Sequence, residues 1–274
     1  MKYVIIVLSL CIAGTLSAWD QENWIYIKNV KEPLKPYYIS KYEVTTIDAV
    51  VLLNWANKNN YITVDNGYIY NRHPQKQLIN YNGAMDGYEC RIEYNGHFFV
   101  DKKYEKYPVN YITYYGALAL CNFKSEKDGL PPVYKMTPEG VELNKSMQGY
   151  RLPTVGEWEW AASSFGANIE FVWGTGKPNG NIAGEEMHEY STMWKVWEGY
   201  RDPYIFTAPV ATFAPNGIGL FDMEGNLSEW VWPGLGKGGS WMTHKPLSLI
   251  GRTQQNREHD FGYTDMTLRM VVDY

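Results

Sequence analysis

The stretch that runs Pro215-Asn-Gly-Ile-Gly-Leu-Phe-Asp-Met-Glu-Gly-Asn-Leu-Ser-Glu-Trp-Val-Trp232 is the densest cluster of glycine, carboxylate and tryptophan residues in the chain. Asp222 and Glu229 flank a Gly225-Asn226 turn. Calcium is held by carboxylates and backbone carbonyls together. A tight glycine turn can direct the carbonyls of Gly225 and Leu227 toward the two carboxylates. Turns rich in acidic residues are common, so a solvated turn is the default interpretation of this spacing alone.

Outward from this stretch, the pattern predicts an α+β fold with sparse regular structure, because helices come early and the later chain is rich in turns. The segment 57–106, and 57–85 above all, is polar and rich in Tyr and Asn. We expect it to be an elaborated, irregular surface region. The expected elements are strands at 24–27 and 37–39, a hairpin at 88–100 around Asn95-Gly96, and helices at 49–56 (capped by Thr46 or Asp48), 114–124 and after Thr154 (with Glu157 in a capping box).

The N-terminus has the order of a secretory signal peptide. Lys2 is followed by an apolar run at 3–13 and by small residues up to Ala18. The run is too short to span a bilayer as a helix. We expect cleavage after residue 18, a single domain at 19–274 without a transmembrane anchor, and export to the periplasm, the cell surface or the medium. Cys11 follows Leu10, which argues against a lipid anchor.

Composition excludes one class of partner and leaves the cysteines open. The net charge is -5 and no basic stripe is present, so nucleic acid is not an expected partner. Aromatic residues make up 16% of the chain, which suits an aromatic core and a broad binding surface. After cleavage only Cys90 and Cys121 remain. They can pair in an exported protein, or Cys121 can be a buried free thiol.

A glycine-rich segment follows the opening stretch and ends at His244. Its glycines permit close backbone approach to the core or to a ligand. Arg252, Arg257 and Arg269 come after it. Arginines here can bind a carboxylate or a peptide, or can join loops by bonding to carbonyl oxygens. For Arg269, in an expected terminal strand, we favour the structural role.

Five sequence blocks in order carry a resemblance to a known family. They are Tyr42-Glu-Val-Thr45; Tyr107-Pro-Val-Asn110 with Ala119-Leu-Cys-Asn122; Tyr150-Arg-Leu-Pro-Thr-Val-Gly-Glu-Trp-Glu-Trp-Ala-Ala162; Pro215 to Trp232; and Gly238-Gly-Ser-Trp241. Together they resemble the formylglycine-generating enzyme (sulfatase-modifying factor) family, from about Tyr37 to the C-terminus. The resemblance implies a C-type-lectin-like α+β fold with short antiparallel strands and a few helices.

The resemblance also implies two structural calcium sites and a position for the catalytic cysteines. The family's enzymes use two cysteines after Gly-Gly-Ser to bind copper(I) and oxidise a substrate cysteine to formylglycine. Here Thr243 and Ser248 match those cysteines. The implied calcium ligands are Asp222, Gly225, Leu227 and Glu229 for one site, and Asn181, Ile182, Asp202 and Tyr204 for the other.

Hydroxyl groups cannot replace the thiol pair. Copper(I) prefers soft thiolates, and a Thr or Ser hydroxyl is hard and has no redox chemistry of its own. We therefore do not expect copper or the oxidase activity. Met242 and His244 alone make a poor copper site, and no acidic residue at a diagnostic spacing would orient a Ser248–His244 hydrolytic pair. The candidates for lining the former substrate groove are Ser240, Trp241, Met242, His244, Arg252 and Arg257.

Three functions follow from the sequence. The first is a non-catalytic binding module that holds a peptide, a glycan or a partner protein in the former groove. The second is a divergent enzyme with metal-assisted chemistry. The third is a surface structural protein that assembles through the aromatic-rich segment 57–85.

Overall fold

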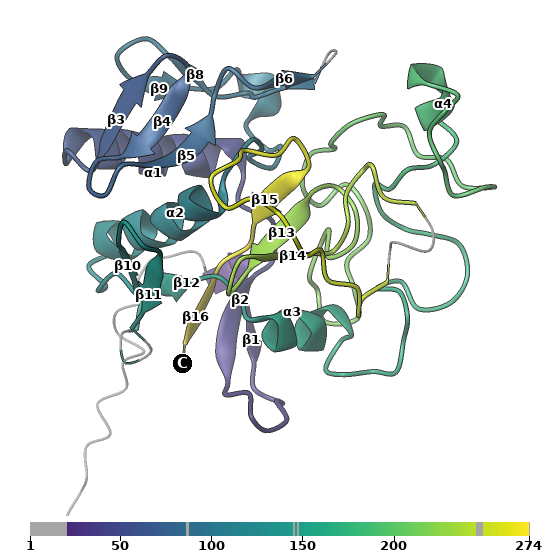
Figure 1. Ribbon diagram of the computed structural model, residues 1–274. Helices are drawn as coiled ribbons and strands as arrows, with labels where there is room; N and C mark the ends of the chain where they lie inside the picture. Colours follow the sequence, from purple (N-terminus) through teal and green to yellow (C-terminus); the bar gives the residue numbers. More distant parts are fainter. Residues whose placement is uncertain (1–20, 86–87, 145, 147, 245–248, 274) are drawn as a thin grey trace, which may run out of the picture.

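Short strands from the two ends of the chain, with one strand from its middle, form the sheet at the centre of the fold (Figure 1). The structure, a computed structural model, describes residues 21–85, 88–144, 146, 148–244 and 249–273. After a 3₁₀ turn, η2 (Gln21–Asn23), come β1 (Trp24–Ile27) and β2 (Tyr37–Ser40). The sheet order is β1-β2-β16-β12, with every neighbouring pair antiparallel. Its other two strands are β12 (Tyr150–Arg151) and β16 (Val271–Asp273).

Threonine side chains begin the three main helices. Thr45 caps α1 (Thr46–Lys58), so the predicted caps Thr46 and Asp48 are both wrong: Thr46 is the first residue of the helix, and Asp48 is the third and forms the capping box with Thr45. Thr113 caps α2 (Tyr114–Lys127). Thr154 caps α3 (Val155–Ala162) in a capping box with Glu157, which confirms that prediction. Each bonded threonine satisfies a backbone N–H that a helix start would otherwise leave unpaired. The short α4 (Met187–Tyr190) has no side-chain cap.

The expectation that 57–106 is irregular is wrong. It forms a three-stranded antiparallel sheet and two small hairpins. Ile62, Ile69 and Leu78 are at most 1% exposed and belong to the same core cluster as α1 and α2. The alternating apolar residues were masked by the many Tyr and Asn residues between them. The elements are β3 (Ile62–Asp65), β4 (Tyr68–Asn71), β5 (Lys76–Asn80), β6 (Ala84–Met85), β7 (Tyr88–Glu89), β8 (Glu93–Tyr94), β9 (Phe98–Phe99) and the 3₁₀ turn η3 (Lys102–Tyr104).

The hairpin around Asn95-Gly96 is confirmed, but it is narrower than expected. Only β8 and β9 pair across it, and Gly96 takes a positive φ of 102°. Residues 88–89 pair instead with β6.

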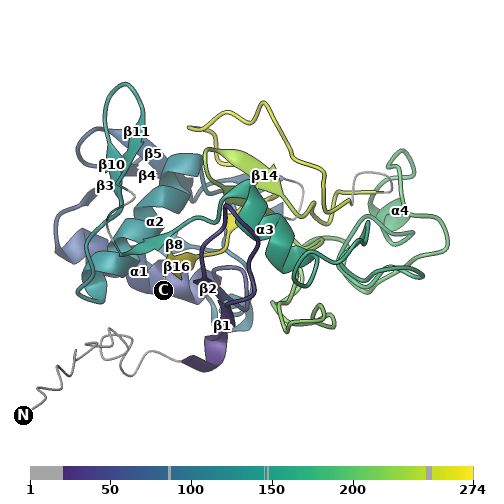
Figure 2. The ribbon, with the colours of Figure 1, turned by 90° about the horizontal axis from the view of Figure 1, so that it is seen from below.

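The later part of the chain is mostly loop, as predicted. In both views α1 and α2 lie on one side of the central strands, and the long loops that carry α4 lie on the other (Figures 1 and 2). A second sheet has the order β14-β13-β15. In it β13 pairs with β14 antiparallel and with β15 in parallel. The remaining strands are β10 (Tyr134–Met136), β11 (Val141–Leu143), β13 (Ser228–Val231), β14 (Leu235–Lys237) and β15 (Met266–Leu268). None of the helices in the described residues has the length and apolar character to cross a membrane.

Candidate functional site

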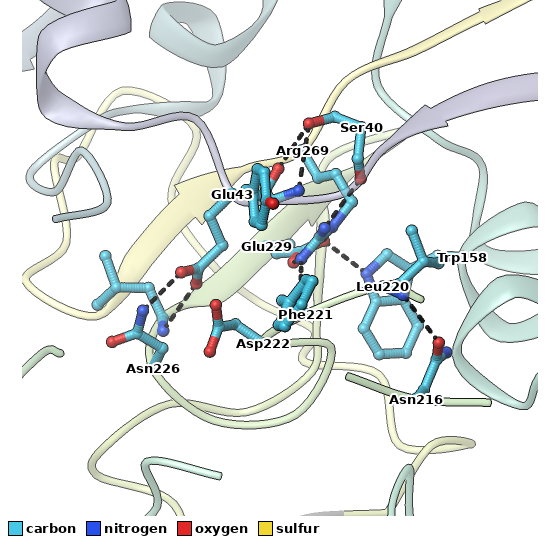
Figure 3. Close-up of polar contacts among 12 residues, drawn as sticks. Ser40, Glu43, Trp158, Asn216, Leu220, Phe221, Asp222, Asn226, Glu229 and Arg269 are labelled. Carbon is cyan, nitrogen blue, oxygen red and sulfur yellow. Dashed lines mark hydrogen bonds and ion pairs between the residues drawn. The ribbon is translucent and has the colours of Figure 1, made fainter. Parts of the chain in front are cut away.

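A buried ion pair joins Glu229, near the end of the stretch 215–232, to Arg269 (Figure 3). The Arg269 Nη2 donates to Glu229 Oε1 at 2.7 Å and its Nε donates at 3.0 Å, and both side chains are at most 1% exposed. Arg269 also donates to the carbonyls of Ser40 (2.9 Å) and Phe221 (2.7 Å). The Trp158 indole donates to Glu229 Oε2 at 2.7 Å. These bonds confirm a structural role for Arg269, and they occupy both oxygens of Glu229.

Two more carboxylates are buried beside this pair. Glu43 accepts hydrogen bonds from Asn226 Nδ2 (2.6 Å) and from the Leu227 backbone N–H (3.0 Å). Asp222 accepts from the Ala211 N–H at 2.8 Å. Burial raises the pKa of Asp222 to about 6, and it raises the pKa of Glu43 well above its usual value, with Asp222 and Glu229 adding to the effect.

One guanidinium therefore faces three carboxylates. Sequence reasoning missed Glu43 as part of this site. The available signal was its place in the Tyr42–Thr45 block, which carries the resemblance.

The excess of negative charge at this first site fits a cation. Among the residues that the structure describes, no three His, Cys, Asp or Glu side chains lie close enough to hold a metal by themselves. A cation here would therefore need backbone carbonyls beside Glu43 and Asp222, and calcium accepts such a mixed set of oxygens. Gly225 has a φ of 91°, and a Cβ on it would lie 2.4 Å from the Asn181 carbonyl oxygen. Only glycine therefore fits the turn that carries the candidate carbonyls.

The second predicted set of calcium ligands also comes together. The Asp202 carboxylate accepts from the Tyr204 N–H at 2.8 Å and lies beside the Ile182 N–H. Asp202 Oδ2 and Asn181 Oδ1 are buried, and neither has a hydrogen-bond partner within the described part of the chain. Burial raises the pKa of Asp202 to about 7, and the neighbouring Glu186 adds to this. Two buried oxygens without partners fit a bound cation, because leaving them unpaired is costly.

Thr243, one of the two positions that match the family's cysteines, is buried in a hydrogen-bonded turn. The Thr243 hydroxyl accepts from the Ser240 N–H at 2.8 Å, and the Thr243 N–H donates to the Ser240 carbonyl at 2.8 Å. Thr243 is only 7% exposed, so its hydroxyl closes a tight turn. Ser248 lies outside the described residues.

Ser240 and Trp241 do not line an open groove, contrary to the prediction. Ser240 is 1% exposed and Trp241 is fully buried. The Trp241 ring packs against those of Tyr88 (5.5 Å between centroids) and Phe206 (5.1 Å). Polarity and glycine content suggested an exposed strand, whereas the aromatic cluster that covers Trp241 comes from distant segments. Met242 is half-buried and remains a candidate for ligand contact.

The other groove candidates divide into two groups. Arg257 donates to both oxygens of Asp265 (3.0 and 2.7 Å) and stacks on Tyr263, so it joins loops and is not a free ligand contact. Arg252 is exposed, and its carbonyl accepts from the buried Lys237 ammonium at 2.8 Å. His244 is half-buried, and burial, followed by the charges of Lys195 and Arg252, lowers its pKa.

Both cysteines after residue 20 are free. Burial raises the pKa of Cys90 to about 12, and it also raises that of Cys121. Neither thiol forms a nucleophilic thiolate near neutral pH, since reactivity requires the thiolate.

The sulfatase-modifying factor enzyme 1-like domain matches residues 13–274 of the chain. The chain belongs to this family. It is 31% identical over 202 residues to the chaperone protein LppX of Paenibacillus barcinonensis, covering 62% of this chain and 71% of LppX. The formylglycine-generating enzyme of Mycobacterium tuberculosis is 36% identical over 116 residues, covering 39% of this chain and 34% of the enzyme. The mouse enzyme is 34% identical over 154 residues, covering 46% of this chain and 40% of the enzyme.

Solved structures confirm the predicted fold. CarF superposes with a TM-score of 0.57 at 25% identity, covering 88% of this chain and 87% of CarF. Treponema denticola variable protein 1 superposes with a TM-score of 0.56 at 22% identity, covering 88% of this chain and 85% of that protein. The matched stretches span well under half of the formylglycine-generating enzymes, so membership of the family does not by itself carry their activity to this chain.

Proposed function

We propose that this member of the sulfatase-modifying factor family is an exported, non-catalytic domain that binds a polypeptide partner. The observation that carries the proposal is the turn at Ser240–Thr243. Where the family's enzymes have a thiol, this chain has a hydroxyl that is buried and hydrogen-bonded to a backbone N–H. Such a group offers copper(I) no soft ligand. The neighbouring Met242 and His244 remain accessible enough to contact a partner.

Two further observations support a binding role. LppX, to which the chain is similar over most of its length, is named as a chaperone protein. The scaffold blocks around the buried Glu229–Arg269 pair are retained, so the fold does not depend on the missing thiols. Because one scaffold can serve several functions, the retained fold is compatible with a change from catalysis to binding.

Calcium is proposed as a structural ion of this domain. Glu43 and Asp222, with carbonyls of the Gly225 turn, would hold it at the first site, and Asn181 and Asp202 would hold it at the second. When bound, it would neutralise buried carboxylates and fix the loops that meet there.

The proposal is tested by incubating the purified protein with a sulfatase-type cysteine peptide, copper(I) and oxygen. Mass spectrometry would then be used to look for formylglycine, with an active formylglycine-generating enzyme as the positive control. We expect no product above the peptide-only control. Turnover by this chain would refute the non-catalytic assignment and favour the divergent-enzyme alternative. A Thr243→Val variant is the matched control, because any turnover that required the Thr243 hydroxyl would be lost in it.

A further inference from the structure

Arg91 differs from the other arginines buried or half-buried in the fold. Arg151, Arg257 and Arg269 each pair with a carboxylate. Arg72 donates to two backbone carbonyls. Arg91 is half-buried just after β7, and among the described residues its hydrogen-bond partner is the neutral hydroxyl of Thr207, at 3.0 Å. Within the described residues, no carboxylate lies within ion-pair distance of it.

Three tyrosine rings surround the Arg91 guanidinium. Its central carbon lies 3.9 Å from the ring centroid of Tyr107, 4.7 Å from that of Tyr104 and 5.6 Å from that of Tyr88. Stacking on ring faces stabilises the cation and leaves the in-plane N–H groups available for hydrogen bonds. A guanidinium has five N–H donors, and one of them is used in a bond to a residue that the structure describes.

The surroundings remove water without supplying a negative charge. Desolvation is the main cause that lowers the pKa of Arg91, as expected for a cation without an anionic partner. The Tyr88 hydroxyl is buried beside Thr207 and Asn110 but makes no hydrogen bond of ordinary geometry with any described residue. The Arg91 guanidinium therefore has both N–H donors and a positive charge that the described residues around it do not compensate.

We propose that Arg91, with Tyr104, Tyr107 and Thr207, is a recognition site for a carboxylate side chain of a polypeptide partner. A planar guanidinium binds a carboxylate through two parallel hydrogen bonds. The adjacent tyrosine rings would cover the apolar stem of a Glu or Asp residue. The site adjoins the turn that holds Thr243, which matches one of the family's cysteines, because the Tyr88 ring contacts both Arg91 and Trp241.

This inference rests on the proposed binding function and makes it specific: the partner would present an acidic residue. It predicts that peptides selected for binding to this protein are enriched in Asp and Glu, and that the enrichment depends on Arg91.

The experiment pans a displayed heptapeptide library on the wild-type protein, on Arg91→Gln and on Lys102→Gln. The last variant removes one exposed positive charge from η3 and keeps the three tyrosines that surround Arg91. We expect the acidic enrichment on wild type and Lys102→Gln, and its loss on Arg91→Gln. For a selected peptide, Arg91→Gln should raise the Kd about tenfold or more, which is the size expected for a charge-assisted hydrogen bond. Replacing the acidic residue of the peptide with its amide should have the same effect on wild type and almost none on Arg91→Gln.

Several results would overturn the proposal. They are the absence of any selected peptide, selected peptides without acidic enrichment, or equal affinity for wild type and Arg91→Gln. Competition by sodium sulfate at matched ionic strength, without binding of acidic peptides, would assign the site to a free tetrahedral anion instead. If Arg91→Gln loses its near-ultraviolet circular dichroism, Arg91→Lys replaces it, since lysine keeps the charge and loses the planar fork. Peptide binding that does not depend on Arg91 would refute this site but would be compatible with the proposed binding function. Formation of formylglycine would refute the non-catalytic function without bearing on the Arg91 site.

Discussion

Replacing Arg269 with methionine should strongly destabilise the protein. The change removes the guanidinium that pairs with Glu229, together with its bonds to the carbonyls of Ser40 and Phe221. Breaking a buried ion pair from one side costs about 3–5 kcal/mol, because the other charge stays buried without a partner. For a domain of this size, that corresponds to a fall in Tm of about 6–20 °C. Urea unfolding followed by tryptophan fluorescence measures the free energy directly.

The matched variant Glu229→Gln should cost less than Arg269→Met. In Glu229→Gln the guanidinium still faces the carboxylates of Glu43 and Asp222, which take over part of its charge compensation. In Arg269→Met, three buried carboxylates lose their shared cation. If Arg269→Met lost less than about 1 kcal/mol, or if Glu229→Gln were the more damaging change, the charge balance inferred for this cluster would be wrong.

Three further predictions follow from individual contacts. Glu224 is 4% exposed, its Oε2 accepts from the Val172 N–H at 2.7 Å, and burial raises its pKa to about 9, above the unfolded value. In metal-free protein, the contribution of the Glu224 carboxyl to the free energy of unfolding should therefore be complete below about pH 4.5. It should be lost as the pH rises to about 9, with a slope of at most about 1.4 kcal/mol per pH unit. Glu224→Gln should flatten the upper part of that profile in pH-dependent urea melts, and an unchanged slope between pH 7 and 9 would contradict the prediction. A calcium chelator should lower the Tm of wild type and should have a smaller effect on Asp202→Asn; isothermal titration that shows the same calcium stoichiometry for both would exclude the second site. Thr154→Ala should cost about 1 kcal/mol through loss of the α3 cap, whereas Thr154→Ser should cost much less.

Local chemistry made the helices predictable from the sequence. A threonine followed three residues later by an acidic residue is a short-range signal, and it placed the start of α3 at the correct residue. The candidate cation sites depend on contacts between residues far apart in the sequence, which local patterns do not predict. Glu43 reaches Asn226 across 183 positions, and no spacing rule links them.

The burial of Trp241 was equally hidden from the sequence. Its ring is covered by Tyr88 and Phe206, which are brought to it by β7 and by a loop without regular structure. A glycine-rich neighbourhood looks the same in sequence whether the backbone approaches a ligand or the core. The strands β3 to β6 were not predicted for a related reason, since tyrosine suits an exposed strand face as well as a loop.

The two candidate calcium sites are joined by two hydrogen bonds between Asn226 and Asn181. The Asn226 N–H donates to the Asn181 carbonyl at 2.7 Å, and Asn181 Nδ2 approaches Asn226 Oδ1 at 3.3 Å. Asn226 also bonds to Glu43 at the first site, and Asn181 belongs to the second. Occupancy of one site would therefore change the affinity of the other, and thermodynamic linkage requires the effect to be equal in both directions. Calcium titrations of this domain should accordingly depart from two independent, identical sites, and the loops on both sides of Asn226 should become ordered together.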